Sequence, residues 1–468
     1  MGQPVQVVIL GGGFSGAVTA IHLARGSRPH ALRITLVNPT PDVGRGLAYR
    51  FDDDNLLLNV PAGNMSALAD EPGHFVAYCQ RIDPSLSSGS FVSRRLYGQY
   101  LEDLWTETEA AHPGMLRKQV DKAVNLKRAA NGSGWDITLA SGQQLSADQV
   151  VLAVGHQAPR LPIPLEPEAR ACVIEPWDFA AMHRLPSDQA VVIVGTGHTA
   201  VDALFCLAQS RPGRPIYLLS RHGLLPHRHR LSTMPPKPPQ AFPEYLRNVP
   251  PTVRACTRAL RQNLKALAEQ GGDWRDALNE LRPHTPQLWQ SWPVAEQRRF
   301  LRHLQAQWDV HRHRLAHMAA QRLDRLLAEG RAQVIAGRIT TIRKQSDGIE
   351  VAYRTRGDRH IAHLSASAVI NCVGPNADIQ RHANPLLTQL LADGLIRPDA
   401  HGLGLMVMPD LQLQNAHQQR VEGLWYVGPL LKGLMWEATA VPELRLHAQR
   451  LTRHLLSHQG HTVAETSA

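Results

Sequence analysis

The chain begins with an apolar segment that leads into a glycine-rich turn and then into a helical segment. Residues 5–10 predict a strand buried on both faces, and residues 17–24 predict a helix. Between them, Gly11, Gly13 and Gly16 lie at the three glycine positions of the dinucleotide-binding fingerprint, with Phe14 and Ser15 opening the helix. Backbone amides at the start of such a helix bind anions. The segment therefore predicts a nucleotide site.

A second strand, glycine turn and helix follow the same pattern in the middle of the chain. Residues 190–194 predict a buried strand, and Ala200 stands at the third small position. The candidate binding residues of this turn are Gly195, Gly197, His198 and Thr199. The chain is thus expected to hold two nucleotides.

Arg221 follows the next predicted strand, residues 215–219. A site for NAD carries Asp or Glu near this position, whereas arginine suits the additional 2′-phosphate of NADP because it contacts phosphate with two N–H groups. An arginine facing solvent on a loop is the alternative. The feature favours NADPH over NADH.

Size and charge limit the classes of protein to consider. The 468 residues suffice for two or three domains, and a hydrophobic content of 43% excludes a disordered chain. The net charge of +10 is spread along the sequence, which indicates a solvated basic surface or attraction of anionic ligands. No aromatic-basic motif indicates nucleic acid, and neither a signal peptide nor a membrane-spanning run is evident. We expect a cytoplasmic protein that binds neither nucleic acid nor membrane.

The cysteines and histidines indicate no metal site. None of the five cysteines forms a C-x-x-C pair, so neither a zinc knuckle nor a redox-active dithiol is predicted. Histidines are frequent between about 224 and 329, but they are interleaved with arginine and lack a fixed set of partner ligands. This stretch begins proline-rich and becomes helical. It is expected to form a helical insertion that acts as a lid or substrate wall.

Three further segments are candidates for the first nucleotide site. The strand at residues 32–37 ends in Asn38, where the fingerprint expects an acidic residue for a ribose hydroxyl. A loop at residues 59–66 contains Asn59, Asn64 and Met65, and capping of turns is the favoured alternative for its asparagines. The strand at residues 149–154 ends at Gly155 and is expected to return to the first sheet.

Two fingerprints, with strands that end at Gly155 and Gly374, occur in the order of one domain interrupted by another. In this order, and in segments 11–16, 59–66, 308–314 and 428–445, the chain resembles the two-dinucleotide-binding-domain flavoproteins. Within them it is similar to a bacterial FAD/NAD(P)-binding family related to flavin-dependent N-hydroxylating monooxygenases. The resemblance implies an α/β fold with two Rossmann-like domains, the NADP domain inserted in the FAD domain, plus a helical insertion.

The resemblance also implies domain boundaries and site residues. Residues 1–160 and 371–468 would form the FAD-binding domain, and residues 161–370 the NADP-binding domain with the helical insertion at about 224–329. The first glycine turn would meet the FAD pyrophosphate and Asn38 the adenosine ribose. The 59–66 loop would border the isoalloxazine, and Gly428 with Glu437 and Ala438 would approach its pyrimidine edge. Pro429 departs from the family's aspartate and has no backbone donor.

The implied chemistry is reduction of FAD by NADPH. A monooxygenase that uses molecular oxygen and a flavin hydroperoxide on a small molecule, with N-hydroxylation of an amine as one form, is the favoured function. An NADPH:acceptor oxidoreductase and a non-catalytic flavin-binding sensor or interaction protein are the alternatives. Glu437 and His198 are candidate acid–base residues, with placement on a helix surface as the favoured alternative, so no catalytic residue is identified. The substrate is not predicted, and a homo-oligomer is left open.

Overall fold

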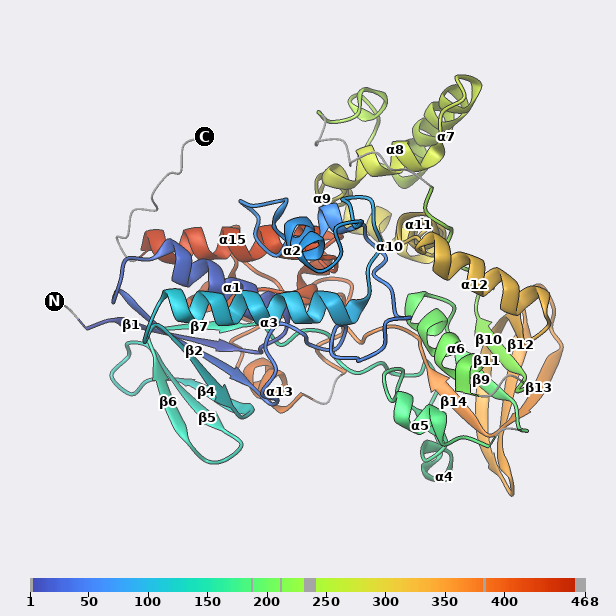
Figure 1. Ribbon diagram of the computed structural model, residues 1–468, viewed down its shortest axis with the longest axis horizontal. Helices are drawn as coiled ribbons and strands as arrows, with labels where there is room; N and C mark the ends of the chain where they lie inside the picture. Colours follow the sequence, from blue (N-terminus) through green and yellow to red (C-terminus); the bar gives the residue numbers. More distant parts are fainter. Residues whose placement is uncertain (1–2, 187, 211–212, 231–240, 382–383, 459–468) are drawn as a thin grey trace.

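The computed structural model describes residues 3–186, 188–210, 213–230, 241–381 and 384–458, and arranges them around two large sheets that lie side by side (Figure 1). The first sheet has the strand order β15-β16-β7-β1-β2-β3. Its strands are β1 (Val5–Leu10), β2 (Leu32–Asn38), β3 (Leu116–Val120), β7 (Gln149–Leu152), β15 (Gln412–Gln414) and β16 (Arg420–Tyr426). All neighbouring pairs are parallel except β15 with β16.

The first sheet joins distant parts of the chain. β7 pairs with β1 and β16 pairs with β7, which confirms the predicted return of the chain after the first glycine turn. Helix α1 (Phe14–Gly26) is buried over 11 of its 13 residues and lies against α15 (Val441–His458). The remaining elements of this part are α2 (His74–Ile82), α3 (Arg94–Ala111), α13 (Pro385–Ala392), α14 (Lys432–Met435) and an antiparallel sheet of β4 (Ala123–Arg128), β5 (Trp135–Leu139) and β6 (Gln144–Ala147).

The second sheet has the order β13-β12-β11-β10-β9-β14-β8. Its strands are β8 (Val173–Ile174), β9 (Val191–Val194), β10 (Ile216–Ser220), β11 (Ala332–Gln345), β12 (Gly348–Thr355), β13 (Ile361–Ala366) and β14 (Ala368–Asn371). The helices around it are α4 (Pro167–Arg170), α5 (Phe179–His183), α6 (His198–Ser210) and α12 (His317–Ala328). β9, β10, β11 and β14 pair in parallel, and β11 pairs with β12 antiparallel.

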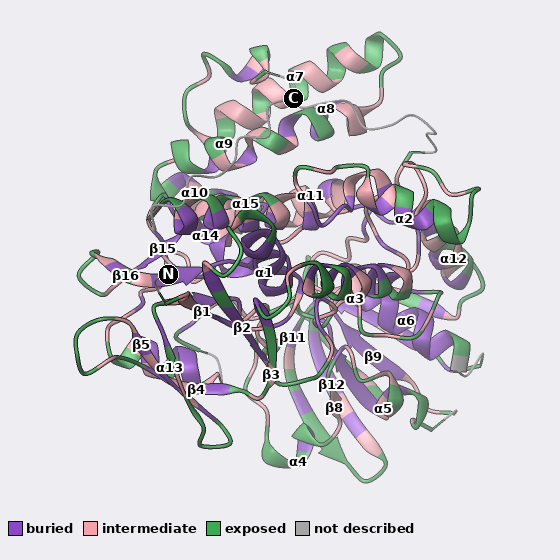
Figure 2. Ribbon diagram, turned by 60° about the vertical axis from the view of Figure 1, so that its left-hand side comes forward, coloured by how far each residue is buried: buried purple, intermediate pink, exposed green. Residues whose placement is uncertain are grey.

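Between β10 and β11 the chain forms the helical region, α7 to α11. Its helices are α7 (Val253–Glu269), α8 (Trp274–Leu281), α9 (Thr285–Ser291), α10 (Val294–His303) and α11 (Gln305–Arg312). α7 and α8 project from the rest of the molecule (Figure 1), and Val253 is the buried residue of α7, whereas α1 is buried nearly throughout (Figure 2). A helical insertion at about 224–329 was predicted, and helices do occupy this stretch.

The described helices include none with the length and apolar character needed to cross a membrane. The helical region is instead fixed to the C-terminal part of the chain by specific polar contacts. The Arg282 guanidinium donates to both carboxylate oxygens of Glu443 on α15, each at 2.7 Å. The Trp289 indole N–H donates to the Gly433 carbonyl at 2.8 Å. The helical region therefore stands over the end of the first sheet that α14 and α15 cover.

Candidate functional site

The first glycine turn, residues 11–16, connects β1 to α1 with no room for a side chain at two positions. Gly11 has φ +121°, and a Cβ there would lie 2.2 Å from the Ala153 carbonyl oxygen. At Gly16 a Cβ would lie 1.9 Å from the Gly11 oxygen. Both approaches are far below contact distance, so the turn and the close helix–strand packing require glycine. The amides that open α1 are left facing the carboxyl edge of the sheet.

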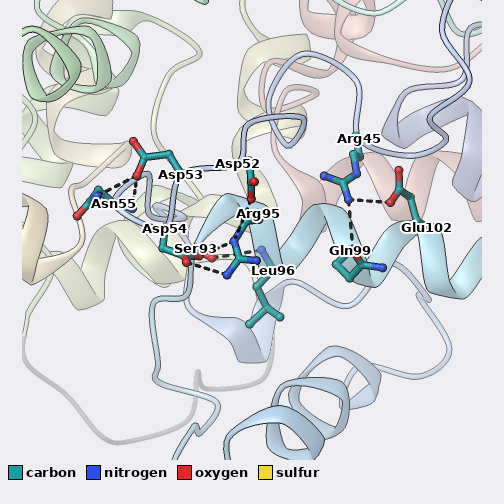
Figure 3. Close-up of polar contacts among 10 residues, drawn as sticks. All are labelled: Arg45, Asp52, Asp53, Asp54, Asn55, Ser93, Arg95, Leu96, Gln99 and Glu102. Carbon is teal, nitrogen blue, oxygen red and sulfur yellow. Dashed lines mark hydrogen bonds and ion pairs between the residues drawn. The ribbon is translucent and has the colours of Figure 1, made fainter. Parts of the chain in front are cut away.

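The segment after β2 passes over this turn and is held by α3. The Gly44 amide donates to the Gly12 carbonyl at 2.8 Å. Figure 3 shows the side chains that anchor the segment to α3: Arg45 with Glu102 at 2.7 Å, and Arg95 with Asp54 at 2.7 Å. These contacts hold the segment that covers the first glycine turn against α3, a helix that begins about 80 residues after the turn in the sequence.

The carboxyl ends of β7 and β16 meet the first glycine turn. Gly155 has φ +64°, and nothing lies within 4 Å of a Cβ built on it. Gly428, with φ +137°, would place a Cβ 2.9 Å from the Tyr426 hydroxyl and 3.9 Å from Ser15 Oγ. The structure thus brings together Gly11, Gly155 and Gly428, which the sequence separates by hundreds of positions.

Asn38, the predicted ribose residue, orders the turn itself. Its side-chain oxygen accepts a hydrogen bond from the Gly12 amide at 3.0 Å, and its amide donates to the Thr40 and Asp42 carbonyls at 2.8 and 3.0 Å. These contacts hold the side chain at the carboxyl edge, next to the glycines. Contact with a ribose stays a prediction.

The 59–66 loop has free polar groups beside a buried methionine. Within the described part of the chain, no hydrogen-bond partner meets the side-chain amides of Asn59 or Asn64, so neither caps a turn as the favoured alternative expected. Met65 is 2% exposed. The Asn59 carbonyl lies 3.0 Å from His229 Nε2 and accepts its hydrogen. The loop therefore contacts the stretch that leads into the helical region.

The second glycine turn, residues 195–200, repeats the geometry of the first. Gly195 has φ +121°, and a Cβ there would lie 2.1 Å from the Cys372 carbonyl oxygen. Gly197 has nothing within 4 Å of a Cβ. The third position is Ala200, which is buried. The turn therefore meets the requirements of a second nucleotide site, with α6 packed slightly less closely than α1.

A basic pair lies at the carboxyl end of β10. Arg221 is exposed, and the Arg356 guanidinium donates to the His222 carbonyl at 3.5 Å. Burial lowers the pKa of His222, and the charges of Arg356 and Arg221 lower it further. Arg356 was not found from the sequence, because it belongs to the turn after β12 and only the β10–β11–β12 pairing brings it to Arg221.

His198 does not lie on an open helix surface, so that expectation is wrong. It is the first residue of α6 and is half-buried, with its Nε2 3.2 Å from the Arg314 carbonyl oxygen. A carbonyl only accepts, so Nε2 carries the hydrogen. Burial lowers the pKa of His198 to about 4, which keeps the ring uncharged at neutral pH. Thr199, the next residue, is also half-buried.

Placement on a helix surface is wrong for Glu437 as well. It lies between α14 and α15 and is 2% exposed. One carboxylate oxygen is 3.2 Å from Arg312 Nη2, and the other accepts from the Trp308 indole N–H at 3.3 Å. Burial lowers the pKa of the Arg312 guanidinium, and Glu437 opposes that effect. Ala438, also predicted as a binding residue, is fully buried beside it.

Residues 308–314 therefore contact both the segment that follows Gly428 and the start of α6. Trp308 and Arg312 hold Glu437 in the segment that follows Gly428, and the Arg314 carbonyl holds His198 at the start of α6. The family resemblance included this segment. Its contacts could not be predicted from the local sequence, because the contacting residues are more than 100 positions apart in the chain.

The helical region lines a partly open cavity of about 640 Å³. Trp308 and Trp436 form one of its walls, so it adjoins Glu437. Its other aromatic rings are Trp274, Trp289, Trp292 and Phe300. Among the residues that the structure describes, no three His, Cys, Asp or Glu side chains gather in a way that could hold a metal ion. A cavity of this size suits a small organic molecule.

Comparison with known proteins places the fold. Residues 8–157 match a family model described as FAD-NAD(P)-binding. L-lysine 6-monooxygenase from Pseudomonas syringae superposes with a TM-score of 0.66 and 16% identity, over 96% of this chain and 99% of that one. DfoA bound to FAD, the cadaverine monooxygenase of Erwinia amylovora, gives 0.63 and 13%, over 100% and 98%.

A disulfide reductase has the same fold with a lower score. The bacillithiol disulfide reductase from Staphylococcus aureus gives a TM-score of 0.56 and 13% identity, over 98% of this chain and 100% of that one. A search of curated proteins finds no match. The chain thus has the predicted α/β architecture of the two-dinucleotide-domain flavoproteins, and its residues 8–157 match the FAD-NAD(P)-binding family model.

Proposed function

We propose that the protein is an FAD- and NADPH-dependent monooxygenase that oxidises a small molecule at an amine nitrogen. The observation that carries the proposal is that residues 308–314 contact both the start of α6 in the second glycine turn and Glu437 in the segment after Gly428, beside an aromatic cavity. Two nucleotide sites serve a hydride donor and its acceptor, and an aromatic cavity can hold the small molecule to be oxidised. A sensor needs only one of these sites.

The residues around the first glycine turn fit FAD. Gly11 and Gly16 permit the tight turn and the close helix–strand packing, and Gly13, where a Cβ would meet only Gly46 at 3.6 Å, leaves room for a pyrophosphate. Nothing lies within 4 Å of a Cβ built on Gly155. In this proposal the binding residues are Gly11, Gly13, Phe14, Ser15, Gly16, Asn38, Asn59, Asn64, Met65, Gly155, Gly428, Glu437 and Ala438. When bound, FAD supplies hydride acceptance and oxygen activation. The polypeptide contributes binding, orientation and exclusion of water.

The residues around the second glycine turn fit NADPH. Gly195 and Gly197 open the backbone to the pyrophosphate, with His198 and Thr199 at the start of α6. Arg221 and Arg356 supply positive charge for a 2′-phosphate at the end of β10. In this scheme residues 1–160 and 371–468 form the FAD-binding domain and residues 161–370 the NADP-binding domain. The last boundary falls within β14.

An amine is the favoured acceptor because the chain lacks the groups that a disulfide reductase needs. All five cysteines are free, and Cys79, Cys206 and Cys372 are buried. Burial raises the pKa of the Cys79 thiol to about 11, which makes it a poor nucleophile. The lysine and cadaverine enzymes, whose overall shape is more similar, act on amines. The balanced reaction is RNH₂ + O₂ + NADPH + H⁺ → RNHOH + H₂O + NADP⁺.

Purified protein tests this function directly. The yellow, FAD-loaded protein is mixed with NADPH and a panel of alkyl and aryl amines in air, and NADPH loss, peroxide and hydroxylamine are measured together. The proposal expects one hydroxylamine per NADPH consumed. Protein that takes up no flavin contradicts it, and so does NADPH oxidation that reduces a quinone without forming any oxygenated product.

A further inference from the structure

The cavity of the helical region has a marked lack of acidic groups. Of the described residues that line it, none is Asp or Glu, while Arg261, His227, His303 and His311 are among them. Three of the nearby carboxylates are engaged with other groups: Glu437 with Arg312, Glu443 with Arg282 and Glu296 with the Val253 amide. An alkylammonium group entering the cavity would therefore lose its water without gaining a counter-ion, which is costly.

Aromatic faces could replace a counter-ion, but protein cations already lie over two of them. Lys432 Nζ is 4.7 Å from the centre of the Trp436 ring, and the Arg275 guanidinium is 4.5 Å from that of Trp274. Arg314 also lies 5.8 Å from the Trp274 ring. A further cation at either of these two rings would meet like charge, which disfavours an ammonium ion there.

The two ends of the cavity differ in polarity. Trp289 stacks on Trp436 with ring centres 4.8 Å apart, and Trp292 and Phe300 complete an apolar cluster. At the other end of the cavity, the rings of His227 and His311 lie 4.4 Å apart beside Trp274. His311 Nδ1 donates to the Gln307 carbonyl at 2.7 Å, so Nε2 is the ring nitrogen left for a ligand. A flat apolar ligand with one weak N–H donor matches this pattern.

Resting on the proposed function, we propose that this cavity binds an uncharged aromatic amine as the substrate, and rejects aliphatic diamines and free amino acids. The nitrogen of an arylamine is uncharged at neutral pH because its lone pair is shared with the ring, whereas an alkylamine is protonated like lysine. The arylamine ring packs among the tryptophans, and its N–H groups donate to the imidazole end. The substrate class thus differs from that of the lysine and cadaverine enzymes with the same fold.

Calorimetric titration of the FAD-loaded protein tests the proposal without turnover. With 4-butylaniline we expect saturable binding, and with cadaverine or L-lysine none at a hundredfold higher concentration. Leu264→Glu places a carboxylate in the cavity wall on α7 and is expected to weaken 4-butylaniline binding at least tenfold. Ala266→Glu adds the same charge on α7 at an exposed position outside the cavity and is expected to stay within twofold. Leu260→Trp, which fills the cavity, should also weaken binding if Leu264→Glu fails to fold.

The outcomes separate this inference from the function on which it rests. Binding of 4-butylaniline with hydroxylamine formation supports both. Binding without any oxidised product supports the cavity as an arylamine site and contradicts the monooxygenase. Hydroxylation of cadaverine or lysine with 4-butylaniline inert keeps the monooxygenase and overturns the inference, as does equal weakening by Leu264→Glu and Ala266→Glu.

Discussion

The two glycine turns are nearly identical in their backbone and differ in what surrounds them. Gly11 and Gly195 share φ +121°, and a Cβ at either would strike a carbonyl oxygen of the neighbouring strand's end at 2.2 and 2.1 Å. Both amides donate to the corresponding strand, to Val37 at 2.9 Å and to Leu219 at 2.8 Å. Both turns therefore begin with glycine for the same steric reason, because a side chain there would clash with a carbonyl oxygen at the end of the neighbouring strand.

The two turns differ in the residues that follow the first glycine. Gly12 is held by the Asn38 side chain, whereas Thr196 at the matching position meets Ser220 through its own hydroxyl at 3.1 Å. Phe14 opens α1, and His198 opens α6. Gly16 corresponds to Ala200. Such differences suit a tightly enclosed nucleotide at the first turn and an exchangeable one at the second.

The third position gives the largest expected effect. Gly16→Ala puts a methyl group 1.9 Å from the Gly11 oxygen, so α1 must move from the sheet, and we expect loss of bound FAD with several kcal/mol of stability. The reciprocal Ala200→Gly removes a methyl group from a helix and should cost only about 1 kcal/mol. Thermal unfolding and flavin absorbance measure both. A Gly16→Ala protein that keeps its flavin and melting temperature would contradict the close packing.

The ion pair of Arg312 with Glu437 gives the next largest expected effect. Arg312→Met leaves the Glu437 carboxylate buried without its cation, which should cost about 3–5 kcal/mol. Arg302→Met, on the exposed side of α10, serves as the control and should change stability by less than about 0.5 kcal/mol. Urea unfolding distinguishes the two. Equal effects would show that the ion pair contributes nothing specific.

His198 at the start of α6 predicts a contribution to the pH dependence of stability that Phe14, at the matching position of α1, does not make. The pKa of His198 is about 4 in the folded protein and about 6.5 when unfolded, so below pH 6.5 the unfolded chain binds the additional proton. Stability from this group is complete above pH 6.5 and falls by about 3 kcal/mol as the pH reaches 4. His198→Phe copies Phe14 and should abolish this part of the pH dependence. Parallel unfolding curves for both proteins from pH 7 to 4 would refute it.

The smallest effect is on nucleotide choice. Arg221→Ala should weaken NADPH binding by about 10–100-fold, the loss expected for a charge-assisted hydrogen bond, and leave NADH and FAD binding unchanged. Measuring KM for both nucleotides provides the comparison. Arg356→Ala is expected to act in the same direction, and an unaltered ratio in both variants would show that the pair does not contact the 2′-phosphate.

Local patterns predicted the elements of both glycine turns, because strand, turn and helix are determined within about 20 neighbouring residues. The apolar run that ends at Gly155 also predicted that β7 returns to the first sheet, whereas the place of the C-terminal segment came only from the family resemblance. The sequence could not place Glu437, since its burial depends on Trp308 and Arg312 from another part of the chain. Nor could the sequence predict the hydrogen bond of His198, because its acceptor is a backbone carbonyl 116 positions away.

The pairing of β16 with β7 has a consequence for synthesis of the chain. The first sheet starts with residue 5 yet lacks β16 and the covering helix α15 until residues 420–458 have left the ribosome, whereas the strands of the second sheet are complete by residue 371. Domains fold as their residues become available during translation. The part that begins first is therefore finished last, and any site that includes Gly428 can form only after the C-terminal segment has been made.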